Sequence, residues 1–139
     1  MRTKRYVFPE NGRTPEYRTQ LEEILSTGLC PFCPENLARW KREPVILERE
    51  HWRIAHNDHP YTNALFHLVL IPRKHVETAR ELSPEAKLEL FDIKDWAEET
   101  CKMPFTLIMR PSSKESGASV AHTHAHLVAA GAEPVITRI

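Results

Sequence analysis

The sequence has little that would place this chain in a membrane or on a polyanion. No apolar run approaches the ~18 residues that span a bilayer, and the N-terminal stretch lacks the apolar core of a signal peptide. The 19 Lys and Arg residues balance the 19 Asp and Glu residues, so the formal net charge is zero. Binding to duplex nucleic acid needs a basic excess on one face, and we therefore expect no such partner. The basic residues Arg2, Lys4 and Arg5 are interpreted as a solvated tail.

Cysteine is also scarce, with three in 139 residues. Two of them form the pair Cys30-Pro31-Phe32-Cys33, which is too little for the disulfide framework of a small secreted domain. We therefore expect a cytoplasmic protein without a membrane span. The length is that of one domain, 1–139, and the 41% of apolar residues is typical of a globular chain with a real core.

Local signals predict two main helices. Thr14-Pro15-Glu16 and Ser83-Pro84-Glu85 each combine a hydroxyl N-cap, a proline at the first helical position and an acid in the first turn. The first helix is expected to run to Thr27, where Gly28 would end it, and the second to about Lys102. Helical spacing predicts the buried side of the second helix. Its expected members are Leu88, Phe91, Ile93, Trp96 and Ala97.

Several short stretches have the composition of strands. They are residues 45–47, 52–55, 67–72, 106–109, 119–128 and, as a final short one, 135–137. The third is a nearly continuous apolar run, typical of a strand that is buried on both faces. The order of a helix, three strands, a second helix and further strands predicts an α+β fold with a mainly antiparallel sheet of about five strands.

Residues 119–128, which read SVAHTHAHLV, place three of the eight histidines at alternate positions. In a strand, His122, His124 and His126 would point to the same face. Each imidazole nitrogen left unpaired on a core face would cost roughly 1–3 kcal/mol, so a joint role is favoured over three unrelated side chains. Two roles are open at this point. The histidines are ligands of a zinc hydrolase, or one of them is a nucleophile for phosphoryl or nucleotidyl transfer.

Cys30 and Cys33 have the spacing of a zinc-binding pair. Two thiolates at this spacing hold one zinc ion tetrahedrally, and histidines distant in sequence would complete the site because a second such pair is missing. A redox pair is the alternative, although the βαβ unit in which it usually occurs is absent. Two inert buried cysteines are a further possibility. His67 opens the apolar strand and His75 follows its end, so both are candidate partners.

Taken together, the segments CPFC, PYTN…HLVLIPRKHV and GASVAHTHAHLV resemble the histidine-triad (HIT) superfamily over about residues 28–130. The family signature is His-φ-His-φ-His-φ-φ, where φ is apolar, and residues 122–128 fit it with a semi-apolar Thr123. The resemblance to zinc-bearing members implies a HIT-like domain, with a helical N-terminal extension over 1–28 and a core over 29–130. It also implies a homodimer, a structural Zn²⁺ ion and a nucleotide substrate, with purines preferred.

The implied activity is that of a nucleotide hydrolase or nucleotidyl transferase. It would act on the α-phosphate of a nucleoside phosphoramidate or (di)nucleoside polyphosphate. His124 would be the nucleophile and form a nucleotidyl-histidine intermediate, with its other ring proton held by a main-chain carbonyl. His126 would contact the phosphate, and Ser119 would help to protonate the leaving group. The zinc ligands implied by the resemblance are Cys30, Cys33, His75 and His122.

Other positions match the family less closely. His67 corresponds to a histidine near the phosphate pocket, but Phe66 stands where the family has Gly. Gly117 would let the backbone approach the phosphate. Asn57 is a candidate for contacting the ribose, and Arg110 is a further candidate nucleotide contact.

Arg110 lies beside Pro111, which occupies the place of the family's Asn or Gln. The third triad position is His rather than the Gln of the uridylyltransferase branch, which favours hydrolysis over transfer to a sugar phosphate. Two alternatives stay open: a zinc-stabilised nucleotide-binding module without turnover, and a metallohydrolase that uses the triad as ligands.

Overall fold

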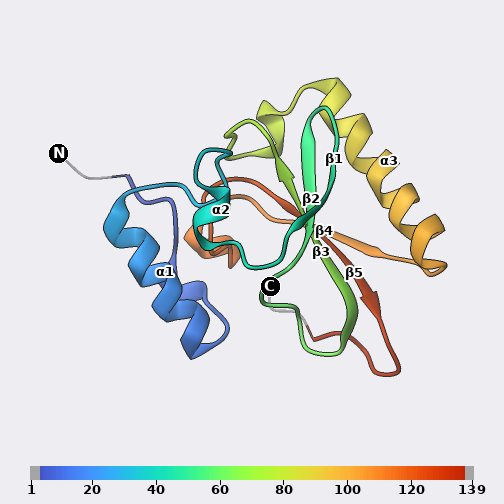
Figure 1. The fold of residues 1–139 in the computed structure, drawn as a ribbon, viewed down its shortest axis with the longest axis horizontal. Coiled ribbons are helices and arrows are strands. Elements are labelled where there is room, and N and C mark those ends of the chain that lie inside the picture. The colour runs from blue at the N-terminus through green and yellow to red at the C-terminus, as the bar shows by residue number, and fades with distance from the viewer. Residues whose placement is uncertain (1–3, 137–139) are drawn as a thin grey trace.

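The centre of the molecule is one antiparallel sheet of five strands. The computed structural model describes residues 4–136. The strands lie in the order β1-β2-β3-β5-β4 (Figure 1). Their bounds are β1 Val45–Glu48, β2 Trp52–His56, β3 Ala64–Pro72, β4 Thr106–Met109 and β5 Ala125–Ala130. The predicted α+β class, with a mainly antiparallel sheet and two main helices, is confirmed.

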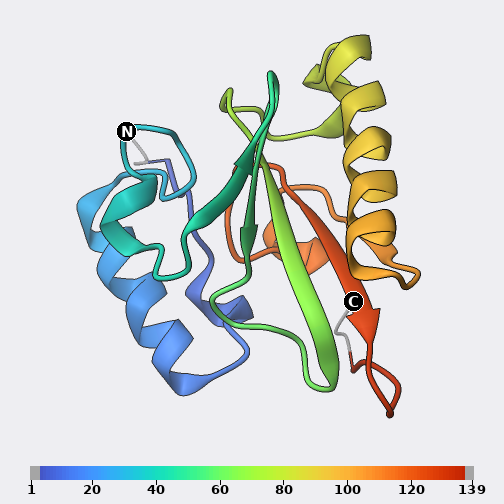
Figure 2. The ribbon, with the colours of Figure 1, turned by 45° about the vertical axis from the view of Figure 1, so that its right-hand side comes forward.

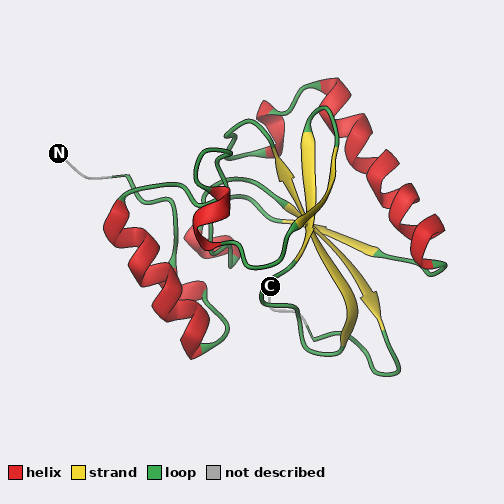
Figure 3. Ribbon diagram, in the orientation of Figure 1, coloured by secondary structure: helices red, strands yellow, loops and turns green. Residues whose placement is uncertain are grey.

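The two main helices begin where the capping signals place them. The helices, red in Figure 3, are α1 Pro15–Thr27, α2 Leu37–Trp40 and α3 Pro84–Cys101, with short 3₁₀ turns at Pro9–Asn11, Ala79–Glu81 and Lys114–Ser116. The Thr14 side chain accepts a hydrogen bond from the first turn of α1, and Ser83 does the same for α3. Gly28 ends α1 with φ 71°, a left-handed conformation that favours glycine. Among the described residues, no helix is long and apolar enough to cross a bilayer.

Helices cover the sheet on two sides. Figure 2 shows α3 against one face, and α1 and α2 beyond the other. Strand β3 lies in the middle of the sheet, so its alternating side chains enter both layers. Leu68 and Leu70 belong to the core under α3, whereas Val69 and Ile71 pack with Leu37 on the opposite side. The two covered faces explain why this strand is a continuous apolar run.

The buried side of α3 differs in part from the prediction. Its buried residues are Ala86, Leu90, Ile93 and Ala97, which recur every three or four positions. Ile93 and Ala97 were expected there, and Trp96 packs against this core while only partly buried. Two further expected members, Leu88 and Phe91, are instead 66% and 56% exposed. A helix turns by about 100° per residue, so these two positions face away from the buried stripe.

The predicted strand over 119–128 is wrong in its first half. Strand β5 begins only at Ala125, so His122 and His124 precede it and the three histidines are not one row on a strand. The reason is local pairing outside the sheet. The backbone N–H of Thr123 donates to the carbonyl of Val76 at 2.7 Å instead of continuing the ladder with β3 or β4.

Both chain ends are described only in part. The predicted strand over 135–137 includes Thr137, which lies outside the described residues, and Ile136 forms an isolated bridge with Thr62. In the N-terminal basic cluster, Arg2 also lies outside the described residues. Lys4 is exposed but forms an ion pair of 2.5 Å with Glu77.

Candidate active site and metal centre

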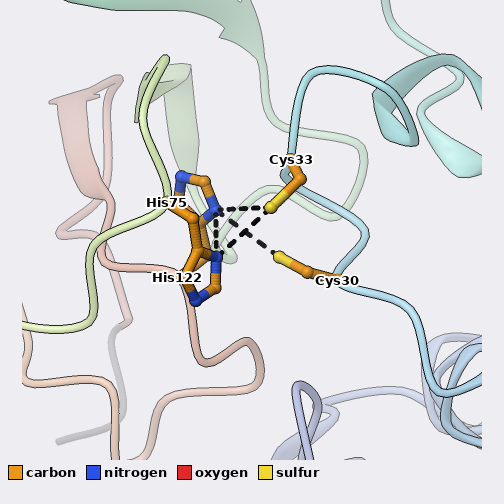
Figure 4. A group of neighbouring side chains, drawn as sticks. All are labelled: Cys30, Cys33, His75 and His122. Carbon is orange, nitrogen blue, oxygen red and sulfur yellow. Dashed lines mark hydrogen bonds between the residues drawn. The ribbon is translucent and has the colours of Figure 1, made fainter.

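Two cysteines and two histidines converge from three separate segments of the chain. Cys30 and Cys33 come from the turn after α1, His75 follows β3, and His122 precedes β5 (Figure 4). Their four ligand atoms all lie within 4.8 Å of one another. The Nδ1 atoms of the two histidines are 3.1 Å apart, and Cys33 Sγ lies 3.3 Å from His75 Nδ1.

The distances fit a tetrahedral zinc site. Zn–S bonds of about 2.3 Å and Zn–N bonds of about 2.05 Å give tetrahedral edges of about 3.3 Å between nitrogens and about 3.6 Å between sulfur and nitrogen. Three of the four S···N distances between the cysteines and the two histidines, Cys33 to His75, Cys30 to His122 and Cys33 to His122, are 3.3, 3.5 and 3.8 Å. The four side chains therefore leave room for one ion at their centre.

The outer ring nitrogens of both histidines are held by acceptors. His122 Nε2 donates to the carbonyl of Pro72 at 2.9 Å, and because a carbonyl only accepts, Nδ1 carries the lone pair that a metal needs. His75 Nε2 lies 2.9 Å from a carboxylate oxygen of Glu77. Such outer contacts orient metal-binding imidazoles and make them better ligands.

The protonation of the four side chains depends on whether a cation is bound between them. Burial raises the pKa of the Cys30 thiol, and burial together with the nearby Cys30 raises the pKa of Cys33 to about 12. A divalent ion would offset this by stabilising the thiolates. Burial also lowers the pKa of His122 to about 4, which keeps its imidazole in the neutral, ligating form. The donor set thus fits zinc in number, type and spacing.

A cavity of about 310 Å³ lies beside the metal centre, within the size range of small-molecule sites. His124 and His126 form part of its wall. The other predicted site residues on the wall are Asn57, Arg110, Gly117 and Ser119. His67 lies behind them and does not line the cavity. The structure therefore brings these residues to one place, while their assigned roles remain predictions.

His124 is held with one ring nitrogen free. Its Nδ1 donates to the carbonyl oxygen of His122 at 2.9 Å, so the proton is on Nδ1 and the lone pair is on Nε2. The Phe32 ring meets the imidazole edge to face at a centroid distance of 5.0 Å. Burial lowers the pKa of His124, against the opposing effect of the carbonyl, and keeps it neutral at pH 7. This is the protonation state that a nucleophile requires.

His126 is oriented by a chain of hydrogen bonds. The backbone N–H of Tyr61 donates to His67 Nδ1 at 2.9 Å, which leaves the His67 proton on Nε2. That Nε2 lies 2.8 Å from His126 Nδ1, so His126 accepts there and carries its own proton on Nε2. Burial lowers the pKa of His67 to about 3 and holds the pKa of His126 well below its usual value. His126 is thereby fixed as a neutral donor.

Ser119 and Gly117 lie on the same wall. The Ser119 hydroxyl is 2.7 Å from the hydroxyl of Tyr17, a residue of α1. Gly117 ends the 3₁₀ turn Lys114–Ser116 with φ 88°, in the left-handed region. The backbone conformation alone therefore favours glycine here, in addition to any close approach of a phosphate.

The two remaining predicted nucleotide contacts lie beside the same network. Asn57 Nδ2 lies 3.4 Å from His67 Nε2, a contact between two atoms that both carry protons, and Asn57 Oδ1 accepts a hydrogen bond from the backbone of His59 at 2.7 Å. Arg110 Nη1 donates to the hydroxyl of Tyr61 at 2.9 Å. Asn57 thus lies next to His67, and Arg110 is joined to it through Tyr61.

Residues near the N-terminus also form part of the cavity, which sequence reasoning missed. The additional lining residues from this part of the chain are Asn11, Arg13, Tyr17, Gln20, Leu21 and Ile24. Arg13 lies over the Tyr61 ring at 4.4 Å from the centroid, and its guanidinium donates to the carbonyl of His59. Local sequence signals mark this stretch only as a capped helix. Nothing in its pattern indicates a site, because the contacts reach across the whole domain.

The HIT domain family matches residues 39–132 of the chain. Several solved structures share the fold. A zinc-bound histidine triad family protein from Mycobacterium smegmatis has a TM-score of 0.60 and 18% identity, over 74% of this chain and 76% of that one. A HIT family hydrolase from Clostridium thermocellum has a TM-score of 0.56 and 24% identity, over 78% and 96%.

A Plasmodium falciparum diadenosine triphosphate hydrolase, in complex with cyclomarin A, has a TM-score of 0.55 and 17% identity, over 67% of this chain and 65% of that one. No curated protein matches the chain. The identities to the solved structures are low, and the likeness is one of fold.

Proposed function

The chain belongs to the HIT domain family, and on this premise we propose that it hydrolyses or transfers a nucleoside monophosphoryl group through His124. The observation that carries the proposal is the hydrogen bond from His124 Nδ1 to the carbonyl of His122. It leaves the Nε2 lone pair on the wall of a cavity large enough for a nucleotide. The solved HIT family hydrolase and the diadenosine triphosphate hydrolase, which have a similar fold, support this class of activity.

The reaction would proceed in two displacements. In the first, His124 Nε2 attacks the α-phosphorus, the P–N bond to the ring forms, and the bond to the leaving group breaks. The leaving atom keeps the electron pair and takes a proton from the Ser119 side of the cavity. The nucleotidyl imidazole is then positively charged, because Nδ1 keeps its proton, and the His122 carbonyl stabilises that charge. In the second displacement, water attacks phosphorus and the electron pair of the P–N bond returns to Nε2. One proton of the water replaces the proton that the Ser119 side gave to the leaving group, and the other stays with the nucleotide product.

The phosphate needs donors as its charge develops. His126 offers one, because the chain from Tyr61 through His67 leaves its proton on Nε2. Arg110 and Arg13 add positive charge near the same imidazole, since both guanidiniums contribute to the lowered pKa of His126. These three side chains form the proposed phosphate end of the cavity.

The apolar part of the cavity wall is suited to a nucleoside. Phe32, Leu37 and Trp40 bring apolar side chains to the cavity wall, where a flat base would be desolvated. Asn57 is the proposed ribose contact. We propose purine nucleotides as the preferred substrates by analogy with the family. A nucleoside phosphoramidate and a (di)nucleoside polyphosphate are the two substrate classes to compare.

We propose Zn²⁺ as the ion held by Cys30, Cys33, His75 and His122. Bound there, zinc would fix the geometry of the segments that carry its ligands and would take no part in the chemistry. The coordinating His122 is also the residue whose carbonyl holds the nucleophile. The proposed homodimer and cytoplasmic location remain predictions.

The deciding experiment traps the intermediate. The protein is mixed with adenosine 5′-phosphoramidate or diadenosine polyphosphate for a short time, quenched at alkaline pH and analysed by mass spectrometry. An adenylyl group on His124 is expected. His124→Ala should lose both the adduct and turnover while it keeps zinc, whereas His51→Ala, outside the cavity, should behave as the original chain.

Two outcomes would contradict this proposal. Undiminished turnover in His124→Ala would exclude His124 as the nucleophile. Nucleotide binding without any adduct or turnover would identify a zinc-stabilised binding module instead.

A further inference from the structure

One hydrogen bond at the cavity joins two distant parts of the chain. The hydroxyl of Tyr17, on α1, lies 2.7 Å from the hydroxyl of Ser119, 102 residues later. Tyr17 lies outside residues 39–132, the part that matches the HIT domain family. The N-terminal segment therefore adds a side chain to the proposed leaving-group side of the site.

Tyr17 is held firmly in this position. Its backbone N–H donates to the N-cap oxygen of Thr14 at 3.1 Å, which fixes the first turn of α1. Its ring stacks on His59 with centroids 4.2 Å apart and 26° between the planes. Further along α1, Leu21 and Ile24 are buried in one cluster with Val120. The helix is thus packed beside Ser119 by apolar contacts, and the phenol is placed by that packing.

The hydrogen bond between the two hydroxyls uses only one of their two protons. Each hydroxyl has one proton, and one hydrogen bond between them uses one. If Tyr17 donates to Ser119, the serine proton is free to point into the cavity. If Ser119 donates to Tyr17, the phenol proton is free instead. The pair can therefore offer a proton to a third group in either arrangement.

We propose that Tyr17 is a positioning residue that acts through Ser119 in protonating the leaving group; this rests on the proposed function. As the bond from phosphorus to the leaving group breaks, the leaving atom keeps the electron pair and takes the Ser119 proton. Ser119 takes the Tyr17 proton in the same step, so the negative charge moves to the phenol oxygen. The attacking water of the second displacement returns the proton to the pair.

Tyrosine suits this role better than serine alone. A phenol has a reference pKa of about 10, so its oxygen bears negative charge more readily than an alkyl hydroxyl. Burial raises the pKa of Tyr17, so the phenol is protonated at rest. The guanidinium of Arg13 acts in the opposite direction and would stabilise the transient phenolate. Tyr17 is thus protonated before the reaction and can release its proton when the bond to the leaving group breaks.

The test compares leaving groups. The rate of adenylyl transfer to His124 is measured in single turnovers with a series of AMP aryl and alkyl esters whose leaving alcohols differ in pKa. The variants are Tyr17→Phe, Ser119→Ala and the double variant. Tyr17→Phe keeps the ring that stacks on His59 and removes only the hydroxyl.

With the alkyl ester, whose leaving group must be protonated, we expect Tyr17→Phe to slow the reaction by about 100-fold. With the p-nitrophenyl ester, whose leaving group departs as a stable anion, the reaction should slow by less than about twofold. KM should change little. The double variant should be no slower than Ser119→Ala alone, because the two hydroxyls act as one unit.

Glu22→Gly is the matched control for the structural role of α1. Glu22 is exposed on this helix and lies outside the cavity, so a glycine there should lower the melting temperature and leave the dependence on the leaving group unchanged. Equal losses of Tyr17→Phe with every ester, or no loss, would overturn the inference while the proposed function stands. If the original chain forms no adduct on His124 with any ester, the proposed function fails and this inference fails with it.

Discussion

The carbonyl oxygen of His122 accepts a hydrogen bond from Nδ1 of His124 at 2.9 Å, while the ring of His122 belongs to the proposed metal centre. One residue therefore joins the two sites: its side chain faces Cys30 and Cys33, and its main chain holds the proposed nucleophile. Phe32, between the two cysteines in sequence, adds a second link through its contact with the His124 ring.

Loss of zinc should consequently disturb catalysis as well as stability. We expect Cys33→Ser to lose the metal, to lower the melting temperature by roughly 10 °C and to reduce kcat by about tenfold, because His122 is no longer fixed. Metal analysis, thermal unfolding and steady-state kinetics measure the three effects. Cys101→Ser is the matched control, since Cys101 is a free cysteine outside the cluster. Full activity and retained metal in the Cys30→Ser, Cys33→Ser double variant would instead favour a metallohydrolase that uses the histidine triad.

The orientation of His126 should depend on His67. His67→Phe preserves a ring in contact with Tyr61 but removes the Nε2 donor to His126, which would then be free to adopt the other tautomer. We expect kcat to fall by about 10- to 100-fold, the loss typical of a residue that orients a functional histidine. Zinc content should be unchanged, because His67 is not among the four proposed metal ligands. An unaltered kcat in this variant would mean that the His67–His126 bond has no role in turnover.

The rate should respond to acid through His124. Its lone pair must be free, and burial lowers its pKa below the usual value of about 6.5. We therefore expect kcat/KM, which reports the free enzyme, to be flat from about pH 8 to about 6.5 and to fall as the pH drops further. The decrease of kcat on the acid side should lie at higher pH than that of kcat/KM, because a bound anionic phosphate favours the imidazolium form of His124. The test is to measure kcat and kcat/KM as functions of pH, with the zinc content checked at each pH. A decrease of kcat/KM that begins well above pH 6.5 would contradict a lowered pKa of His124.

The predicted homodimer can be tested on α3. Leu88 and Phe91 are exposed apolar side chains one turn apart on this helix, and a subunit interface would bury them. Leu88→Glu and Phe91→Glu should convert a dimer to a monomer in sedimentation experiments, while Lys87→Glu, at a neighbouring exposed position, should not. A monomeric original chain would refute the homodimer, and a dimer that survives both changes would place its interface elsewhere.

The sequence by itself determined the features that depend on a few neighbouring residues. Thr14 and Ser83, each followed by a proline, set the starts of the two main helices. The first N–H groups of a helix have no partner within it, and a neighbouring hydroxyl supplies one. The apolar run in β3 indicated burial on two faces, since alternate side chains enter both layers. The family motif likewise marked the histidine and cysteine positions that the fold brings together.

Only the tertiary structure decided how these parts meet. Strand β5 starts after His124 rather than before His122, because the preceding backbone pairs with the segment after β3, a choice that no local pattern encodes. The contact of Tyr17 with Ser119 depends on how α1 packs across 102 residues of chain. Caps and periodicity fix an element, but its neighbours are set by the burial of apolar surface over the whole domain. That burial placed a tyrosine from the N-terminal helix at the proposed active site.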